Sequence, residues 1–225
     1  QTTVAAANGI KSDDYQGFTR GTPVAIATTT LNINSDNKSF GISHKFNDLT
    51  LGVLKENGTF LGNYANNALI NVEGSTTAYV GLNKEYVVDN TTIFGGINLG
   101  ATKLNVGESM MTSTDTVFSN SANIGAKYTI DNRQFGMVAG LPVAITSGSA
   151  KFNVPSNVSA DGDIETMTMT SSLASRSREF DLGLFYNLQF SDSATMSTFI
   201  EKRFNHSGNS NVTSTGFGIG YTASF

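Results

Sequence analysis

Residues 213–225 at the end of the chain read TSTGFGIGYTASF. From Phe217 onward every second residue is large or apolar, and the residues between are glycine, threonine or serine. The apolar set is Phe217, Ile219, Tyr221, Ala223 and Phe225. Side chains along a β-strand point alternately to opposite faces, so strict alternation predicts a strand whose two faces meet different surroundings. The stretch therefore predicts a C-terminal β-strand with one oily face and one face of small or polar residues.

The same alternation recurs through most of the chain. Its clearest instance is REFDLGLFYNLQF at 178–190, where every second residue from Phe180 is large and apolar. Similar stretches lie at 23–34, 39–46, 49–53, 76–88, 93–102, 121–130, 133–145 and 193–204. We therefore expect about ten strands, most of them near the roughly 9–11 residues that a tilted strand needs to cross a membrane.

The composition fits membrane-spanning strands better than a soluble domain. Charged residues make up 14 % of the chain, against roughly 25 % in ordinary soluble domains. Hydrophobic residues reach only 39 %, and Ser, Thr, Asn and Gly fill the difference. A transmembrane barrel needs neither a charged surface nor a Leu-rich core, because lipid covers one face and the lumen is polar. No apolar run approaches the ~20 residues of a transmembrane helix.

Two further features of the composition limit which partners and which cellular locations fit the chain. The net charge is −4 without a basic stripe, which argues against a nucleic-acid partner. The chain has no cysteine, which suits an exported protein.

The connections between the predicted strands alternate in length. Short turns are expected at Asn47-Asp48, Asp89-Asn90, Asp131-Asn132 and Ser191-Asp192. Long polar loops are expected near 57–75, 105–117, 146–177 and 205–212. Short turns at one end and long loops at the other are typical of outer-membrane barrels, with the short turns on the periplasmic side.

Aromatic residues gather beside the short turns, which predicts an aromatic girdle at one membrane interface. The set is Phe46, Tyr86, Tyr128, Phe190 and Phe225. Lipid offers no hydrogen-bond partners, so a spanning sheet must close on itself. We predict an all-β fold, a transmembrane antiparallel up-and-down β-barrel of about 10–12 strands over residues 22–225, in the bacterial outer membrane. Residues 1–21 are a linker, a pore-lining segment or the remnant of an earlier strand.

The alternative fold is a soluble β-sandwich of short strands. It accounts for the alternation, but not for the order of short and long connections, the low charge or the terminal Phe225.

Six charged residues fall on the lumen-facing positions of the predicted strands. They are Glu85, Lys127, Glu179, Asp181, Glu201 and Arg203. Ionisable groups inside a membrane are costly without partners, so the set predicts a charge network that holds a plug or lines a polar pore. The alternative is ordinary, mutually satisfied lumen polarity. In either case we expect Arg203 to pair with Glu179, Asp181 or Glu201.

Three stretches of the second half resemble a known family. LPVAITSGSAKFNVPSN at 141–157, RSREFDLGLFYNL at 176–188 and HSGN at 206–209 resemble the C-terminal translocator domain of subtilase-type bacterial autotransporters. The aromatic terminus also resembles the closing strand of an outer-membrane barrel, which the insertion machinery recognises. The family usually has twelve strands and a helix through the pore, whereas we find about ten strands and no amphipathic helix in 1–21.

The resemblance implies a translocator and anchor domain that holds an N-terminal passenger and helps to export it by type V secretion. The chain begins at Gln1 rather than Met, so it is either a processed mature protein or, as we expect, a fragment of a longer one. Expected partners are outer-membrane lipid, the insertion machinery through the strand ending in Phe225, and the passenger or a surface protein. The alternative function is a free-standing small barrel, either a narrow porin or a structural anchor.

We expect no enzyme activity, cofactor or metal, because the family's catalytic residues would lie on a passenger. Asp161-Gly162-Asp163 could coordinate Ca²⁺, although such a cluster is more often a turn. His206 with a loop aspartate could indicate a surface protease of the omptin type, which also uses ten strands. That chemistry needs paired acid–base groups facing one another at the barrel rim.

Overall fold

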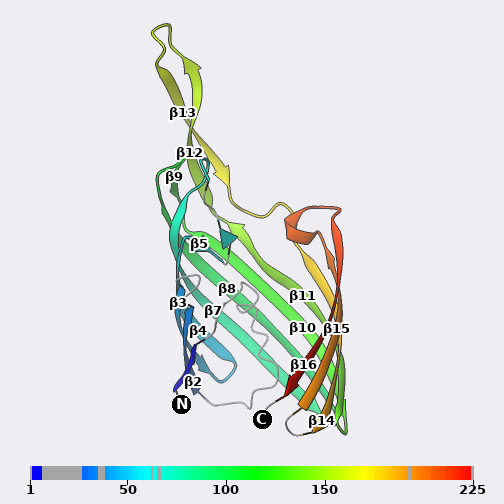
Figure 1. Ribbon diagram of the computed structural model, residues 1–225. Helices are drawn as coiled ribbons and strands as arrows, with labels where there is room; N and C mark the ends of the chain where they lie inside the picture. The colour runs from blue at the N-terminus through cyan, green and yellow to red at the C-terminus, as the bar shows by residue number, and fades with distance from the viewer. Residues whose placement is uncertain are drawn as a thin grey trace. The chain divides into compact units, whose positions relative to one another are not determined.

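The computed structural model describes residues 2–6, 27–34, 39–61, 63–64, 67–191 and 194–223. These residues form three β-sheets, the largest with 11 strands in the order β1-β2-β3-β4-β7-β8-β10-β11-β14-β15-β16 (Figure 1). The strands of this sheet are β1 (Thr2–Ala6), β2 (Ala27–Asn34), β3 (Ser39–Phe46), β4 (Leu49–Asn57), β7 (Val72–Val88), β8 (Thr91–Val106), β10 (Val117–Ile130), β11 (Arg133–Ser147), β14 (Phe180–Ser191), β15 (Ala194–Phe204) and β16 (Thr213–Ala223). No helix among the described residues is long and apolar enough to cross a membrane.

The strands follow one another in up-and-down order. Neighbours in the large sheet are consecutive along the chain, apart from the short strands that belong to the two smaller sheets. The pairs β2–β3, β3–β4, β11–β14, β14–β15 and β15–β16 are antiparallel. The expected class, all-β with 10–12 antiparallel up-and-down strands, is therefore confirmed. The exception is β1, which pairs with β2 in parallel.

Tight turns form where the sequence predicted them. Asn47, Asp89 and Asp131 each have a positive φ, near 50°, a backbone conformation that Asn and Asp tolerate better than most residues. Each starts a two-residue turn between strands that are neighbours in the sheet. Asp192, in the fourth predicted turn, lies outside the described residues, as do residues 7–26 of the N-terminal segment.

The chain divides into two compact units. The first comprises 1–81, 98–120 and 145–174, and the second comprises 82–97, 121–144 and 175–225. Strands β7, β8, β10 and β11 contribute residues to both units.

The first unit contains a small hydrophobic core. Val72, Met111 and Ala150 are buried, and they pack against partly buried side chains from the neighbouring segments. Those side chains are Phe60, Ile70, Leu104, Val106, Phe152 and Leu173. Short strands contribute to this core: Met111 begins β9 (Met111–Thr114), and Phe60 ends β5 (Thr59–Phe60), which pairs with β6 (Asn63–Tyr64).

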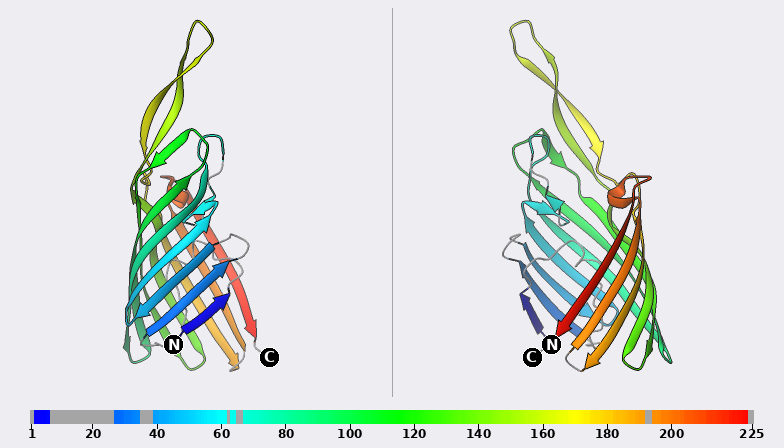
Figure 2. Two further views of the ribbon diagram at one scale, coloured as in Figure 1. Left: turned by 90° about the vertical axis from the view of Figure 1, so that its left-hand side faces the viewer. Right: turned by 45° about the vertical axis from the view of Figure 1, so that its right-hand side comes forward.

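The prediction of one long polar loop over 146–177 is wrong. β12 (Ser149–Val158) and β13 (Ile164–Ser172) form an antiparallel hairpin, and β9 pairs with the base of β12. The hairpin extends past the other strands of its unit (Figures 1 and 2). Its residues are polar because both faces are largely exposed, but alternating Thr, Met, Phe and Val still favour extended backbone.

The second unit ends in a three-stranded meander of β14, β15 and β16 (Figure 2). The β15–β16 register runs without a shift from Ala194–Ala223 to Phe204–Thr213. A single 3-10 turn, His206–Gly208, lies in the connection between these two strands.

Candidate functional site

An apolar face runs along the strands of each unit. In the second unit, Leu184 is 57 % exposed on β14 and Ile219 is 66 % exposed on β16, while the residues between such positions are mostly half-buried. The other exposed side chains of this face in the second unit include Leu82, Tyr86, Ile93, Ile97, Ile124, Phe135, Met137, Leu182, Ile200, Phe217 and Tyr221. In the first unit, Ile42, Leu51 and Val53 continue the pattern on β3 and β4. Monomeric soluble proteins rarely expose contiguous apolar surface of this kind.

The opposite face, the polar face, carries glycines that aromatic rings cover. An ideal Cβ on Gly218 would lie 2.2 Å from Phe199, and one on Gly136 would lie 2.5 Å from Phe185. The first unit has the same arrangement, with Tyr79 lying 2.3 Å from a Cβ built on Gly52. Each ring occupies the space above a glycine on the neighbouring strand, so a larger residue there would displace it. These pairs were not predicted from the sequence, although the regular glycines at alternate positions were a signal for them.

The predicted interfacial aromatics lie at strand ends. Phe46, Tyr86, Tyr128 and Phe190 each lie within two residues of the end of their strand, beside a short connection. Phe46, Tyr86 and Phe190 are more than half exposed, and the Tyr128 ring lies 5.3 Å from that of Phe135. Phe225 lies outside the described residues.

A cluster of charged residues gathers where β14 and β15 meet the η2 connection. The Arg203 guanidinium donates to Glu201 Oε1 at 2.5 Å, so Arg203 pairs with one of its three expected partners. His206 Nδ1 lies 3.0 Å from Glu179 Oε1. Asp181 is the cross-strand neighbour of Arg203 in the β14–β15 register. The structure therefore brings four of the six predicted charged residues together.

Two atoms in this cluster have no hydrogen-bond partner among the described residues. They are Oδ1 of Asp181 and Nε of Arg203, and both are buried. Buried polar atoms are normally paired with protein groups or ordered water. The cluster therefore departs from full hydrogen bonding at these two atoms.

The remaining two predicted charges lie elsewhere. Glu85 is on β7 and Lys127 is on β10, and neither belongs to the ion pairs formed by Arg203 and His206. His206 also belongs to this cluster, although the predicted set of lumen-facing charges did not include it. Just before β14, burial lowers the pKa of the Arg178 guanidinium below its ordinary value, and its Nη2 donates to the Leu141 carbonyl at 3.5 Å.

A buried carboxylate lies on the polar face of the first unit, at Glu56 of β4, and is 4 % exposed. Its Oε2 accepts from the Leu61 amide at 2.9 Å and from the Ser75 hydroxyl at 3.1 Å. Its Oε1 accepts from the Thr59 hydroxyl at 3.3 Å. These bonds join β4 to β5, to the residue after β5 and to β7. Nothing in the sequence marks this site, because Ser75 is brought to Glu56 only by the pairing of β4 with β7.

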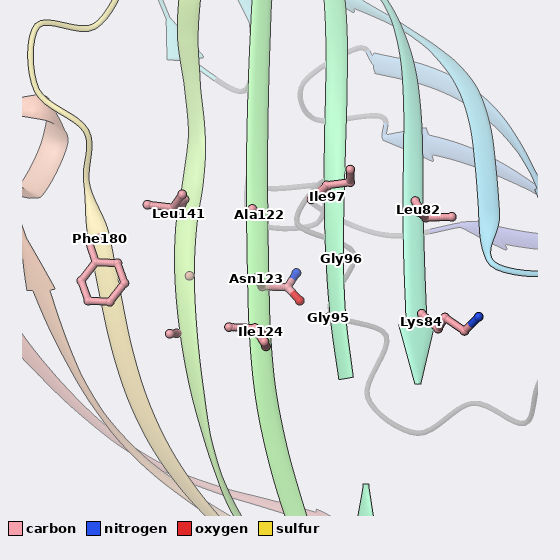
Figure 3. A pocket seen from close by; sticks show the side chains of 12 residues that line it. Leu82, Lys84, Gly95, Gly96, Ile97, Ala122, Asn123, Ile124, Leu141 and Phe180 are labelled. Atoms are coloured by element: carbon pink, nitrogen blue, oxygen red, sulfur yellow. The ribbon is translucent and has the colours of Figure 1, made fainter. Parts of the chain in front are cut away.

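A shallow hollow of about 480 Å³ lies on the apolar face of the second unit (Figure 3). Small residues, Gly95, Ala122 and Ala139, lie between larger side chains there. The larger lining residues are Leu82, Lys84, Ile97, Ile124, Leu141 and Phe180.

The residues considered for metal binding and proteolysis have other partners. Asp161, Gly162 and Asp163 form the turn of the β12–β13 hairpin, where the Asp163 amide donates to the Ser159 hydroxyl at 3.0 Å. No group of three or more potential metal-ligating side chains occurs within the described part of the chain. The acidic partner of His206 is Glu179, rather than a loop aspartate.

Comparisons with known proteins found a low similarity to two solved structures. No protein-family model and no curated protein matches the chain. Two crystal structures of the toluene transporter TodX from Pseudomonas putida resemble it, with 14 % and 11 % sequence identity and TM-scores of 0.43 and 0.41. The matches cover 83 % and 82 % of this chain and 59 % of each TodX chain. The chain thus spans less than two thirds of the length of these transporters.

Proposed function

We propose that this chain is a β-barrel domain of the bacterial outer membrane, with its apolar face against the acyl chains. The observation that carries the proposal is the row of exposed large hydrophobic residues at alternate positions on successive strands. Burying apolar surface in lipid is favourable by about 25 cal/mol per Å². An open sheet edge in lipid would leave backbone groups without partners, so the sheet closes in the membrane.

Purification with and without detergent tests this proposal. We expect the chain to require detergent or lipid to stay in solution, and to migrate faster on a cold gel than after boiling. A folded, monomeric chain in detergent-free buffer would overturn it, because the exposed apolar face would then tolerate water.

We further propose that the domain anchors an N-terminal passenger and helps to export it to the cell surface. Support comes from the resemblance of 141–157, 176–188 and 206–209 to autotransporter translocator domains.

A reporter domain fused ahead of Gln1, behind a signal peptide, tests the export role. We expect external protease to remove the reporter from intact cells that carry a folded barrel. A control lacking β16 should lose both the folded barrel and the surface reporter. A periplasmic reporter attached to a correctly folded barrel would contradict the export role and leave the membrane assignment in place.

The second candidate function is a narrow pore, and the charge cluster of β14 and β15 favours it. Ion pairs such as Arg203–Glu201 on the polar face are typical of water-filled barrel interiors. Conductance in planar bilayers tests this role, and Arg203→Gln should change the preference between cations and anions. Bilayers that stay silent although the protein has inserted would exclude it.

A further inference from the structure

The hairpin of β12 and β13 has two edges that differ in their capacity to pair with another strand. On the β12 side, β9 covers Ala150–Phe152, and the Asn153 amide donates to the Met110 carbonyl at 2.8 Å. Farther out, Pro155 lacks an amide proton and the register shifts between Pro155 and Asn157. Proline and bulges are devices that keep an edge strand from pairing. The β12 edge is therefore protected against pairing with a further strand.

The β13 edge has no such protection. All nine residues of Ile164–Ser172 are exposed, and none is proline or lysine. The register with β12 runs without a shift from Thr166 to Ser172. β13 is also the terminal strand of its sheet, whose order is β13-β12-β9. This edge therefore offers a straight row of backbone groups to a further strand.

The register identifies which backbone groups face the open edge. Asn153 is directly opposite Thr168, and the Asn153 amide points away from β13 toward Met110. In an antiparallel pair both residues then turn their backbone groups outward, and the pattern repeats every second residue. Thr166, Thr168 and Thr170 therefore direct their N–H and C=O groups to the open edge.

The sequence of β13 around Thr168 is symmetrical. Residues 166–170 read Thr-Met-Thr-Met-Thr, which is the same in both directions. If two copies pair antiparallel about Thr168, each Thr168 faces its counterpart, and Met167 faces Met169. Glu165 then faces Ser171, so no two carboxylates meet across the pair. A two-fold contact of this kind is self-complementary, as the commonest dimers are.

We propose that two copies of this chain associate through their β13 strands, paired antiparallel about Thr168. The strand that pairs with the open edge of β13 is thus β13 of a second copy. Met167 and Met169 are about half exposed and lie on the same face as their cross-strand partners Val154 and Phe152. Pairing joins the two apolar stripes into one. It also supports a protruding two-stranded ribbon, which alone is marginally stable.

Single-cysteine cross-linking of the folded full chain tests the register, because the chain has no cysteine of its own. Across such a pair the Cα atoms of the two Thr168 residues lie roughly 5.5 Å apart, within the span of a disulfide. Under mild oxidation, with micelles in excess over chains, Thr168→Cys should form a covalent dimer. Thr166→Cys alone should not, whereas a mixture of Thr166→Cys and Thr170→Cys chains should. Absence of the Thr168→Cys dimer, or equal cross-linking by Thr166→Cys alone, would overturn the proposal.

A second measurement separates pairing from folding. Thr168→Pro removes an amide that faces the open edge, whereas Thr168→Val keeps that amide and a β-branched side chain. Sedimentation should show a loss of dimer for the proline variant and no loss for the valine variant. Both variants should keep the heat-modifiable gel migration of the native chain, which reports a folded sheet. Undiminished dimer in a folded Thr168→Pro variant would refute the β13 contact.

Discussion

At the scale of single residues, side chains packed over the glycines of the polar face limit which substitutions these glycine positions tolerate. Gly218 and Gly220 are on the same face of β16, two positions apart. A Cβ on Gly218 would meet the Phe199 ring at 2.2 Å, whereas the nearest atom to a Cβ on Gly220 is 4.0 Å away. The same substitution should therefore have different consequences at these two positions.

We expect Gly218→Ala to destabilise the folded domain by about 1–3 kcal/mol, because the added methyl group must displace a packed ring. Gly220→Ala is the matched control and should change the stability by less than about 0.5 kcal/mol. Urea unfolding in detergent measures both. Equal effects at the two glycines would show that the Phe199 contact is unimportant.

A second residue-scale prediction concerns Glu56. Glu56→Gln replaces one acceptor oxygen by an amide group that faces existing donors, and should cost about 1–3 kcal/mol of folding free energy. The control is Glu73→Gln, because Glu73 is exposed and its carboxylate accepts from Asn105 Nδ2 at 3.2 Å. Urea midpoints of the two variants provide the comparison, and an unchanged midpoint for Glu56→Gln would contradict the prediction.

At the scale of elements, the first unit holds two methionines in opposite environments. Met111 begins β9 and is 2 % exposed in the small core, whereas Met167 lies on the hairpin strand β13 and is 48 % exposed. The long polar connections thus contain both packed and exposed strands.

Truncating these two methionines should show that the core contributes to the folding free energy and that the exposed face of the hairpin does not. Met111→Ala should cost about 2–5 kcal/mol, because it leaves a cavity beside Val72 and Ala150. Met167→Ala should change the unfolding free energy of the monomer by less than about 0.5 kcal/mol. Thermal or urea unfolding at high dilution measures both, and a similar loss for the two would place the hairpin within the core.

At the scale of the whole molecule, we expect a charge added to the apolar face of the large sheet to cost more folding free energy in lipid than the same charge added to the polar face. Leu184→Arg puts a cation on the apolar face and should cost about 2–4 kcal/mol in lipid vesicles if that site lies near the bilayer centre. Gln189→Arg adds the same side chain on the polar face of β14 and should have little effect. Reversible folding into vesicles supplies the free energies. A Leu184→Arg variant as stable as the native chain would mean that water, not lipid, covers Leu184.

The sequence by itself determined the strand class, the approximate number of strands in the large sheet and three tight turns, because these depend on a two-residue period and on Asn or Asp at turn positions. It also indicated that Arg203 would have an acidic partner, since Glu201 lies two positions away on the same face of β15.

Only the tertiary structure decided which polar residues meet. Glu56 finds its partners on two segments, 59–61 and β7, His206 joins the cluster through the fold of a loop, and Phe199 covers a glycine on the next strand. The 146–177 hairpin was missed for a related reason: its polarity resembles that of a loop, and its backbone pairing involves residues up to 23 positions apart, from Ser149 to Ser172. Local periodicity reports on the environment of each strand, whereas contacts between strands depend on register and loop closure.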